Sequence, residues 1–394
     1  MSHSVKPLRR IVVIGGGAAG VSAAETLRAA GYDGSLVLLA RESALPYDRP
    51  PLSKQVLSGS WDHDRTTLRE PAHYDELDIV LRHTPASGLD LGNRVVRLNG
   101  DPGLPFDGVV VATGVQPRRL PSWHQLEGVH VLREHADVTR LREAFLSGGR
   151  VVIVGGGVLG MEVAASARNL GLDVTVVEPL AHPMLRQAGA EVAAAVGRLH
   201  RDHGVDLRTG VGVAEILDDG TSATGVALSD GTVVSAGCVL VSIGATPTVD
   251  WLRDSGLSLG DGVECDEYCK AAPGVYAAGD VASWFNPRYD RRMRLEHRIN
   301  ATEQGRAAAR NLLEGDATPF SPLPYFWTDQ YDVKIQVHGL IPPDATMTVV
   351  EGAIDDGRFV AEYRDGGELT GVLGWNFPAR LLAHRKRLLV PSGP

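Results

Sequence analysis

Residues Arg9–Leu27 read RRIVVIGGGAAGVSAAETL, and residues Gly149–Ala167 read GRVVIVGGGVLGMEVAASA. Each stretch begins with a β-branched run, breaks at three glycines, and continues with small and apolar residues at helical spacing. A second apolar run follows each, SLVLLARE at Ser35–Glu42 and LDVTVVEP at Leu172–Pro179. The repeated strand–turn–helix–strand unit predicts an α/β fold with two Rossmann-like nucleotide-binding domains, each built on a parallel sheet buried on both faces.

Further segments complete the predicted domains. FDGVVVATG (106–114), AGCVLVSIGATP (236–247) and VYAAGDVAS (275–283) are typical of buried strands that end in small-residue turns. The last part of the chain is richer in aromatics and proline, and it alternates as strands at Thr346–Ala353 and Arg358–Tyr363 before a helix, PARLLAHRKRLL. We expect this tail to form a small C-terminal α+β domain. The expected boundaries are 1–118 and 246–321 for the first nucleotide-binding domain, 119–245 for the second, and 322–394 for the tail.

Composition excludes several classes of protein. A chain of 394 residues is too long for one hydrophobic core. A net charge of -9, from 39 basic and 48 acidic side chains, argues against nucleic-acid binding. No apolar run approaches the roughly 20 residues that span a bilayer. MSHSVKPLRR leads directly into the first strand, without the apolar stretch of a signal peptide. We therefore expect a cytoplasmic protein with no membrane partner.

The cysteines indicate neither a disulfide framework nor a metal site. There are three, Cys238, Cys265 and Cys269, and they form no CxxC pair. The stretch around the last two reads as strand, turn and strand, which favours reduced thiols with a structural role. No metal site is expected.

The first glycine motif is Gly15-x-Gly17-x-x-Gly20. Glycines at this spacing allow a tight turn, a close approach of the backbone to a pyrophosphate, and close packing of helix on strand. Ala18 and Ala19 open the helix, whose N-terminus attracts phosphate. Glu42, at the end of the next strand, is the candidate ligand of the adenosine ribose. Arg41 is the alternative contact, to adenine or a phosphate, unless it is simply solvated.

The second motif is Gly155-x-Gly157-x-x-Gly160, with Val158 and Leu159 between its last two glycines. Glu178 ends the following strand and is placed to bind a ribose diol. Its carboxylate would repel the additional phosphate of NADPH, and no arginine follows to reverse that preference. The second site is therefore predicted to prefer NADH.

The whole pattern is similar to one known family. It includes PYDRPPLSK at Pro46–Lys54, the ATG turn at Ala112–Gly114, the Gly155–Glu162 segment, AAGD at Ala277–Asp280 and FWTDQYDVKIQ at Phe326–Gln336. With these motifs the chain resembles, over essentially its whole length, the FAD-dependent, NADH-using ferredoxin reductases that serve haem monooxygenases and Rieske-type dioxygenases. The resemblance implies FAD in the first nucleotide-binding domain and NAD in the second.

The resemblance also implies roles for single residues. Asp280 would bond a ribityl hydroxyl of FAD, and Arg49 and Lys54 would lie along the FAD, with Lys54 near the flavin edge. Glu162 would form an ion pair with Lys54 beneath the nicotinamide, because a buried ammonium is costly alone and tolerable beside a carboxylate. These two are the candidate catalytic residues. The competing interpretation of Glu162 is a solvated helix residue.

A helix beginning near Glu296 would point its N-terminus, with His297, at the flavin pyrimidine ring. In the family a tryptophan commonly stands where this chain has Arg298, so that position departs from the pattern. Trp327 matches the family and would lie near the flavin at the electron exit; the competing interpretation is a core aromatic. The remaining predicted cofactor contacts are Ala112, Thr113, Gly114, Arg118, Gly244 and Gly279.

The function implied is transfer of electrons from NADH through FAD to a ferredoxin-type iron–sulfur protein. Related flavoproteins reduce disulfides or peroxides through a cysteine beside the flavin, which some of them carry shortly before the LPY segment. This chain has no cysteine there and no CxxC pair elsewhere. Two alternatives stay open: another acceptor such as rubredoxin, and a non-enzymatic NADH-binding flavoprotein with a signalling or docking role. We expect a monomer or a weak homodimer.

Two basic clusters are candidate docking surfaces for an acidic iron–sulfur protein, unless they are ordinary solvated side chains. The first cluster is Arg288, Arg291, Arg292, Arg294 and Arg298, and the second is Arg385, Lys386 and Arg387.

Overall fold

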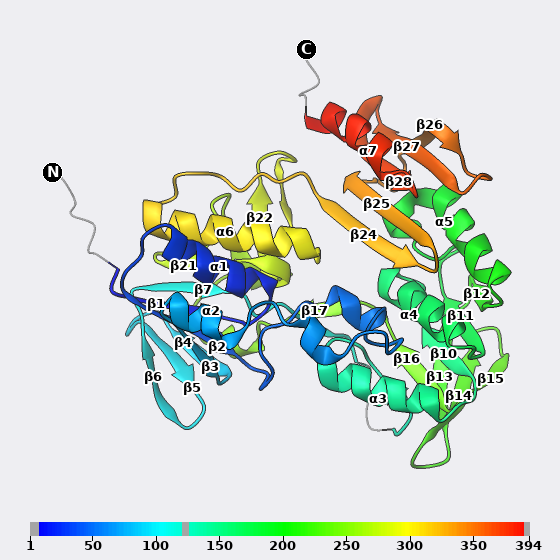
Figure 1. The fold of residues 1–394 in the computed structure, drawn as a ribbon, viewed down its shortest axis with the longest axis horizontal. Coiled ribbons are helices and arrows are strands. Elements are labelled where there is room, and N and C mark those ends of the chain that lie inside the picture. Colours follow the sequence, from blue (N-terminus) through cyan, green and yellow to red (C-terminus); the bar gives the residue numbers. More distant parts are fainter. Residues whose placement is uncertain (1–7, 120–125, 390–394) are drawn as a thin grey trace. The chain divides into compact units, whose positions relative to one another are not determined.

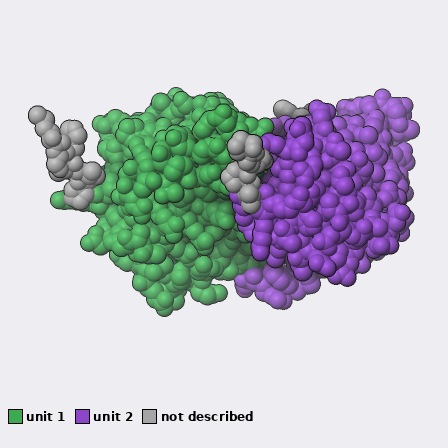
Figure 2. All heavy atoms as spheres, turned by 90° about the horizontal axis from the view of Figure 1, so that it is seen from above, with its two compact units in different colours: residues 1–48, 66–116, 246–322 green, residues 49–65, 117–245, 323–394 purple. Residues whose placement is uncertain are grey.

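The computed structural model describes residues 8–119 and 126–389, and the chain divides into two compact units. Unit 1 comprises residues 1–48, 66–116 and 246–322, and unit 2 comprises residues 49–65, 117–245 and 323–394 (Figure 2). The chain leaves unit 1 in the short strand β8 (Val115–Pro117) and returns to it in β17 (Ala245–Pro247). Each unit is thus assembled from segments that are far apart in the sequence.

A six-stranded sheet forms the centre of unit 1, in the order β20-β21-β7-β1-β2-β3 (Figure 1). Its strands are β1 (Arg10–Ile14), β2 (Ser35–Ala40), β3 (Ile79–His83), β7 (Gly108–Val111), β20 (Lys270–Ala272) and β21 (Val275–Ala277). Neighbouring strands are parallel except for β20 with β21. β1 and β7 are buried along nearly all of their length, which explains their continuous valine and isoleucine runs.

The main helices of unit 1 are α1 (Ala18–Ala29), α2 (Pro71–Glu76) and α6 (Arg298–Glu314). α1 and α6 pack closely, and the missing side chain of Gly305 permits this. A Cβ on Gly305 would lie 2.2 Å from the carbonyl oxygen of Ala19. Two further sheets complete the unit. The first is antiparallel and contains β4 (Ala86–Asp90), β5 (Val95–Leu98) and β6 (Asp101–Pro105). The second is mixed and contains β18 (Leu259–Gly260), β19 (Gly262–Cys265), β22 (Ala282–Asn286) and β23 (Arg291–Met293), with β19 parallel to β22.

A second parallel sheet forms the centre of unit 2, in the order β12-β11-β10-β16-β9. Its strands are β9 (Val129–His130), β10 (Val151–Val154), β11 (Val174–Glu178), β12 (Asp206–Thr209) and β16 (Cys238–Val241). The accompanying helices are α3 (His135–Leu146), α4 (Val158–Asn169) and α5 (Leu185–Asp202). An antiparallel sheet of β13 (Val213–Asp218), β14 (Ala223–Leu228) and β15 (Val233–Ser235) shares a core with it through Val152, Val226 and Val239.

The last part of unit 2 is an antiparallel sheet in the order β24-β25-β28-β27-β26, drawn in orange and red in Figure 1. Its strands are β24 (Tyr325–Gln330), β25 (Val333–Gly339), β26 (Thr346–Ala353), β27 (Arg358–Asp365) and β28 (Glu368–Trp375). Helix α7 (Pro378–Arg385) covers this sheet by packing Leu381 against Val360 and Val372. Short 3-10 helices occur at η1 (Pro50–Ser53), η2 (His63–Thr66), η3 (Asp250–Leu252), η4 (Gly279–Val281) and η5 (Lys386–Leu389).

The predicted fold class is confirmed: both repeated units form parallel sheets, and the tail is an antiparallel sheet with a helix. The functional domain boundaries at residues 118, 245 and 321 remain a prediction. In the structure, residues 49–65 and the tail group with unit 2. Within residues 8–119 and 126–389, no helix is both long and apolar enough to cross a membrane. Residues 1–7, which entered the expectation that the chain lacks a signal peptide, lie outside the described part.

Candidate active site

The first glycine turn joins β1 to α1 in unit 1. Gly15 has a φ of +125°, and a Cβ on it would lie 2.1 Å from the carbonyl oxygen of Ala112. A Cβ on Gly20 would lie 1.8 Å from the carbonyl oxygen of Gly15, so both positions need glycine. Helix α1 begins after Gly17, with no side-chain cap and no acid in its first turn. Its first backbone N–H groups are thus suited to an anion such as a pyrophosphate.

Several other predicted residues follow strand ends at the same edge of the sheet. β2, β1, β7 and β21 are parallel neighbours, so their carboxyl ends meet at one edge. The residues that follow these ends are Glu42 after β2, Ala112, Thr113 and Gly114 after β7, and Gly279 and Asp280 after β21. This edge, rather than any single motif, is the candidate FAD site of unit 1.

Glu42 and Arg41 differ in their surroundings. The Tyr47 hydroxyl donates to Glu42 Oε2 over 2.5 Å, and the Glu42 carboxylate is half-buried at the strand end. Arg41 is exposed. Tyr47 belongs to the PYDRPPLSK motif, which therefore orients the predicted ribose ligand. Glu42 as the ribose contact remains a prediction.

The N-terminus of α6 lies beside the same motif. The helix begins at Arg298, two residues later than Glu296, with His297 as its N-cap. Arg298 Nε donates to Asp48 Oδ1, and Arg298 Nη1 donates to the Thr302 hydroxyl. Glu296 is exposed and pairs with Arg294 over 2.7 Å. The departure at Arg298 therefore introduces a cation at a helix N-terminus, where the helix dipole disfavours it and Asp48 offsets it.

Buried polar atoms in α6 fit a bound dinucleotide. Asn300 is 4% exposed, and its Oδ1 has no hydrogen-bond partner within the described residues. Gln304 Oε1 accepts from the backbone N–H of Gly279 over 2.9 Å, so this face of α6 adjoins the Gly279 turn. A buried acceptor without a partner is costly unless a ligand supplies one. Burial also lowers the pKa of His297 to about 4, which leaves that imidazole neutral.

The second glycine turn repeats the first within unit 2. A Cβ on Gly155, which has a φ of +106°, would lie 2.2 Å from the carbonyl oxygen of Ser242. A Cβ on Gly160 would lie 2.1 Å from the carbonyl oxygen of Gly155. Gly157 faces open space, and the next residues, Val158 and Leu159, are only half-buried. The turn thus presents backbone and the start of α4 for a second phosphate group.

Glu178 ends β11 beside this turn. Its Oε2 accepts from the Gly156 N–H over 2.7 Å, and its Oε1 accepts from the Leu180 N–H over 2.8 Å. The residue is 8% exposed. Each carboxylate oxygen keeps a further lone pair for a ribose hydroxyl. The two backbone donors fix the carboxylate in place, which suits a ribose ligand and disfavours a nearby phosphate.

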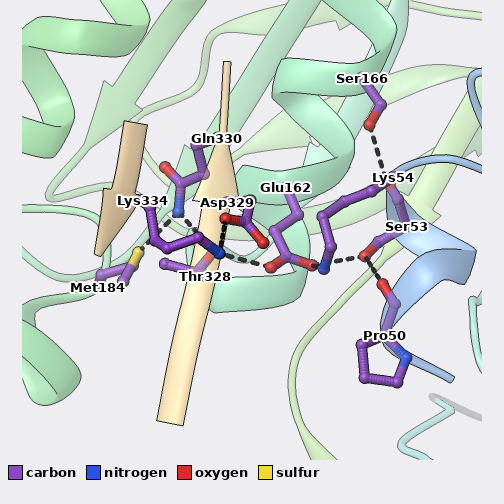
Figure 3. A network of polar contacts seen from close by, with 10 residues as sticks. All are labelled: Pro50, Ser53, Lys54, Glu162, Ser166, Met184, Thr328, Asp329, Gln330 and Lys334. Carbon is purple, nitrogen blue, oxygen red and sulfur yellow. Dashed lines mark hydrogen bonds and ion pairs between the residues drawn. The ribbon is translucent and has the colours of Figure 1, made fainter. Parts of the chain in front are cut away.

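The centre of the polar network in unit 2 is an ion pair between Lys54 and Glu162 (Figure 3). Lys54 Nζ lies 2.8 Å from Glu162 Oε2, and the two side chains are 13% and 7% exposed. Glu162 is therefore not a solvated helix residue. It lies in the first turns of α4, two residues after Gly160, the third glycine of the second motif.

Two hydroxyls complete the coordination of the Glu162 carboxylate. The Ser53 hydroxyl donates to Oε2 over 2.5 Å, and the Thr328 hydroxyl donates to Oε1 over 2.8 Å. The Ser166 hydroxyl, also on α4, donates to the Ser53 carbonyl oxygen over 2.7 Å. The carboxylate thus has three donors, one of them cationic, which compensate its burial.

Four predicted residues lie elsewhere in unit 2. Arg118 is exposed, and its backbone N–H donates to the carbonyl oxygen of Gly244 over 3.0 Å. Arg49 is half-buried and precedes η1. Trp327 is half-buried on β24 and stacks on Tyr325 with ring centroids 6.0 Å apart. Their contacts with a cofactor remain predictions.

Sequence reasoning missed Ser53 and Thr328. Both were within quoted motifs, since Ser53 precedes Lys54 in PYDRPPLSK and Thr328 follows Trp327 in FWTDQ. Their hydroxyls reach Glu162 across 109 and 166 residues of sequence. No spacing rule predicts such long-range contacts.

The surroundings of the three cysteines exclude disulfide exchange by a thiolate. Cys238, Cys265 and Cys269 are free and buried. Burial raises the pKa of Cys238 and of Cys265 to about 12, and it raises that of Cys269 further. None of them can supply a thiolate for disulfide exchange. No group of three or more metal-binding side chains occurs in the described part of the chain.

Comparison with known proteins agrees with this geometry. The pyridine nucleotide-disulphide oxidoreductase family matches residues 9–305, and the reductase C-terminal family matches residues 325–390. The ferredoxin–NAD(+) reductase component of the p-cumate 2,3-dioxygenase system of Pseudomonas putida is 40% identical over 343 residues, covering 84% of this chain and 81% of that protein.

Two solved structures match over nearly the whole chain. The ferredoxin reductase for the CYP199A2 system of Rhodopseudomonas palustris has a TM-score of 0.93 at 32% identity, covering 96% of this chain and 94% of that one. The covalent complex of putidaredoxin reductase with putidaredoxin has a TM-score of 0.91 at 31% identity, covering 96% and 93%. The chain therefore belongs to the pyridine nucleotide-disulphide oxidoreductase family, among the ferredoxin reductases of oxygenase systems.

Proposed function

We propose that this protein oxidises NADH with a bound FAD and reduces a small ferredoxin-type iron–sulfur protein that serves an oxygenase. The glycine turn, strand edge and α6 of unit 1 would hold FAD, and the Gly155 turn with Glu178 would hold NADH. A bound flavin would supply the conversion between a two-electron donor and a one-electron acceptor, a chemistry that no side chain can perform.

The observation that carries the proposal is the buried Lys54–Glu162 pair. An ion pair of this kind adds little stability over apolar residues, so its presence calls for another explanation. A fixed ammonium stabilises negative charge that accumulates near it during reduction. The carboxylate and its two hydroxyl donors hold that ammonium in one position.

The acceptor is proposed from the relatives. One solved relative is a covalent complex with putidaredoxin, and another relative is named as a ferredoxin–NAD(+) reductase component. Acidic acceptors need basic surface, and the first basic cluster divides in the structure. Arg294 pairs with Asp261 and Glu296, and Arg292 Nη1 donates to the carbonyl oxygens of Cys265 and Ser283.

Arg288 and Arg291 are exposed members of this cluster, and neither guanidinium pairs with an acid within the described residues. Arg288 Nε lies 3.5 Å from the carbonyl oxygen of Ser321. In the second cluster, Arg387 pairs with Glu362 on β27, which reduces its effect at the surface. We therefore propose the β22–β23 hairpin as the docking surface.

The test is anaerobic reduction of the FAD-loaded protein by NADH, followed by mixing with oxidised [2Fe–2S] ferredoxin, bacterial ferredoxin or rubredoxin. Rapid bleaching of the flavin and then of a ferredoxin supports the proposal. Bleaching by NADH with transfer only to rubredoxin would identify another acceptor. Flavin that NADH does not reduce would contradict the proposal and favour a binding or signalling role.

A further inference from the structure

A line of buried polar side chains continues behind Glu162, away from Lys54. It consists of Thr328 and Gln330 on β24, His200 on α5 and Tyr331 in the turn after β24, and we call these four residues the relay. Thr328, Gln330 and His200 are each at most 1% exposed. Figure 3 shows its first part, with Gln330 between Thr328 and Met184. The relay lies wholly in unit 2.

The donors and acceptors of the relay can be assigned from its chemistry. Gln330 Nε2 lies 3.2 Å from Met184 Sδ and 3.2 Å from Thr328 Oγ1. A thioether has no proton to donate, so the amide nitrogen rather than the oxygen faces it. Gln330 Oε1 therefore faces His200 Nε2, at 2.9 Å, and can only accept.

His200 must then carry its proton on Nε2. Burial lowers the pKa of His200 to about 4, so the ring is neutral and Nδ1 keeps its lone pair. The Tyr331 hydroxyl lies 3.3 Å from Nδ1 and is its donor. The Tyr331 ring is held by stacking on His203, with centroids 3.7 Å apart. All four hydrogen bonds therefore run in one direction, from Tyr331 through His200, Gln330 and Thr328 to Glu162.

This direction matters because the Thr328 hydroxyl can rotate. A hydroxyl has one proton and two lone pairs, and it donates to whichever acceptor its rotation favours. Gln330 donates to the Thr328 oxygen and occupies a lone pair, which leaves the hydroxyl proton for Glu162. His200 in turn holds the Gln330 amide in the orientation that makes it a donor to Thr328. Hydrogen bonds in such a chain also strengthen one another.

We propose that Gln330 and His200 are positioning residues for reduction of the flavin by NADH, because they fix the Thr328 hydroxyl as a donor to Glu162 and so fix Lys54. This inference rests on the proposed role of the Lys54–Glu162 pair. The relay would make α5 and the C-terminal sheet contribute to the site. None of the four relay residues is proposed to touch the reacting atoms.

The decisive variant is Gln330→Glu, which keeps the shape and reverses the direction. A carboxylate at 330 cannot donate to Thr328 and accepts the hydroxyl proton instead, which turns that proton away from Glu162. Stopped-flow flavin reduction at saturating NADH should slow at least about tenfold, the effect expected when a buried charged group loses a donor. The NADH concentration for half-maximal rate should change little.

A double-mutant cycle tests whether Gln330 acts through Thr328. Thr328→Val and Gln330→Leu should each slow reduction about tenfold. The double variant should be no slower than either single variant, because Gln330 has no route to Glu162 without the hydroxyl. Thr175→Val is the matched control, a fully buried threonine of unit 2 on β11, and it should leave the rate unchanged.

A spectroscopic measurement tests the directions independently of activity. In protein labelled with ¹⁵N-histidine, the His200 ring should show the neutral Nε2–H tautomer between about pH 6 and about pH 8. His200→Gln, which restores an N–H donor toward Gln330, should recover more of the rate than His200→Leu. An Nδ1–H tautomer at His200, or multiplicative effects of Thr328→Val and Gln330→Leu, would overturn the relay.

The failure of this inference differs from that of the proposed function. If Lys54→Met and Glu162→Gln slow flavin reduction but Gln330→Glu does not, the relay is structural and the proposed function stands. If none of these variants slows reduction, the Lys54–Glu162 pair has no role in it and this inference fails, whereas the proposed function fails only if NADH does not reduce the flavin of the wild-type protein.

Discussion

Variants of the buried Lys54–Glu162 pair should change the stability of the protein and the rate of flavin reduction in different orders. Removing one partner leaves the other charge uncompensated, which costs about 3–5 kcal/mol in a buried pair. The two single variants should differ in stability. In Lys54→Met the Glu162 carboxylate keeps the Ser53 and Thr328 hydroxyls, whereas in Glu162→Gln the ammonium loses the negative charge 2.8 Å away. Glu162→Gln should therefore be the less stable variant.

The catalytic effect should not follow that order. If the ammonium stabilises charge during reduction, a loss of about 3 kcal/mol at the transition state slows flavin reduction by about a hundredfold. Both single variants should show this in anaerobic stopped-flow experiments with NADH. The double variant, Lys54→Met with Glu162→Gln, has no buried charge and should recover most of the melting temperature without recovering the rate.

The control for both measurements is a solvent-exposed ion pair of unit 2 that lies outside the glycine motifs and the PYDRPPLSK motif. Arg140, paired with Asp137 on α3 at 2.7 Å, has a side chain that is 58% exposed, and Arg140→Met should change neither quantity by much. If the double variant regained both stability and rate, the pair would be a structural element only. Wild-type rates in both single variants would refute the reasoning more simply.

Four further predictions follow from the same geometry. FAD should be non-covalent, so acid precipitation should release it into the supernatant; FMN, or pigment left on the pellet, would contradict this. Glu178→Ala should narrow the preference for NADH over NADPH in steady-state assays, and a wild-type protein that uses both equally would refute the role of Glu178. Burial lowers the pKa of His200, His297 and His338 to about 4, while the unfolded chain binds these protons near pH 6.5. Stability should therefore fall as the pH drops from about 6.5 to about 4, by up to about 1.4 kcal/mol per pH unit for each histidine, and melting curves that do not shift would oppose this. Arg291→Glu should slow ferredoxin reduction and flatten its salt dependence while NADH still reduces the flavin, and unchanged salt dependence would move the docking surface elsewhere.

The features predictable from sequence were those that local chemistry dictates. The glycine turns could be predicted because a Cβ at Gly15 or Gly155 would clash with the residue that follows a neighbouring strand, Ala112 or Ser242. The parallel sheets could be predicted because strands buried on both faces are continuously apolar. The start of α6 was less well predicted, and the helix begins at Arg298 rather than near Glu296. Nothing in the local sequence distinguishes the last loop residues from the first helical ones there.

The surroundings of Glu162 could not be predicted in the same way. A glutamate on the first turns of a helix is usually solvated, and its burial becomes visible only when β24 is placed beside α4. The internal pairing of the arginines was also hidden. A run such as RRMR looks like a uniform basic surface, yet Arg292 and Arg294 alternate along β23 and its extension with a buried methionine between them. The number of basic residues in a segment is therefore an upper limit to the number of unpaired cations that it presents at the surface.

The arrangement around Glu162 connects the C-terminal sheet to the candidate site through the Thr328 hydroxyl. The carboxylate sits on α4, its cation and one hydroxyl come from the 50–54 segment, and its other hydroxyl comes from β24. Three separate segments must fold together before the charge is compensated, and a buried carboxylate that lacks one of them is destabilised. The pair thus couples the correct placement of β24 and of the PYDRPPLSK motif to the same titratable group. A substitution on β24 or in the PYDRPPLSK motif that removes a donor to Glu162 should therefore alter the position of the Lys54 ammonium, even when it changes neither glycine motif.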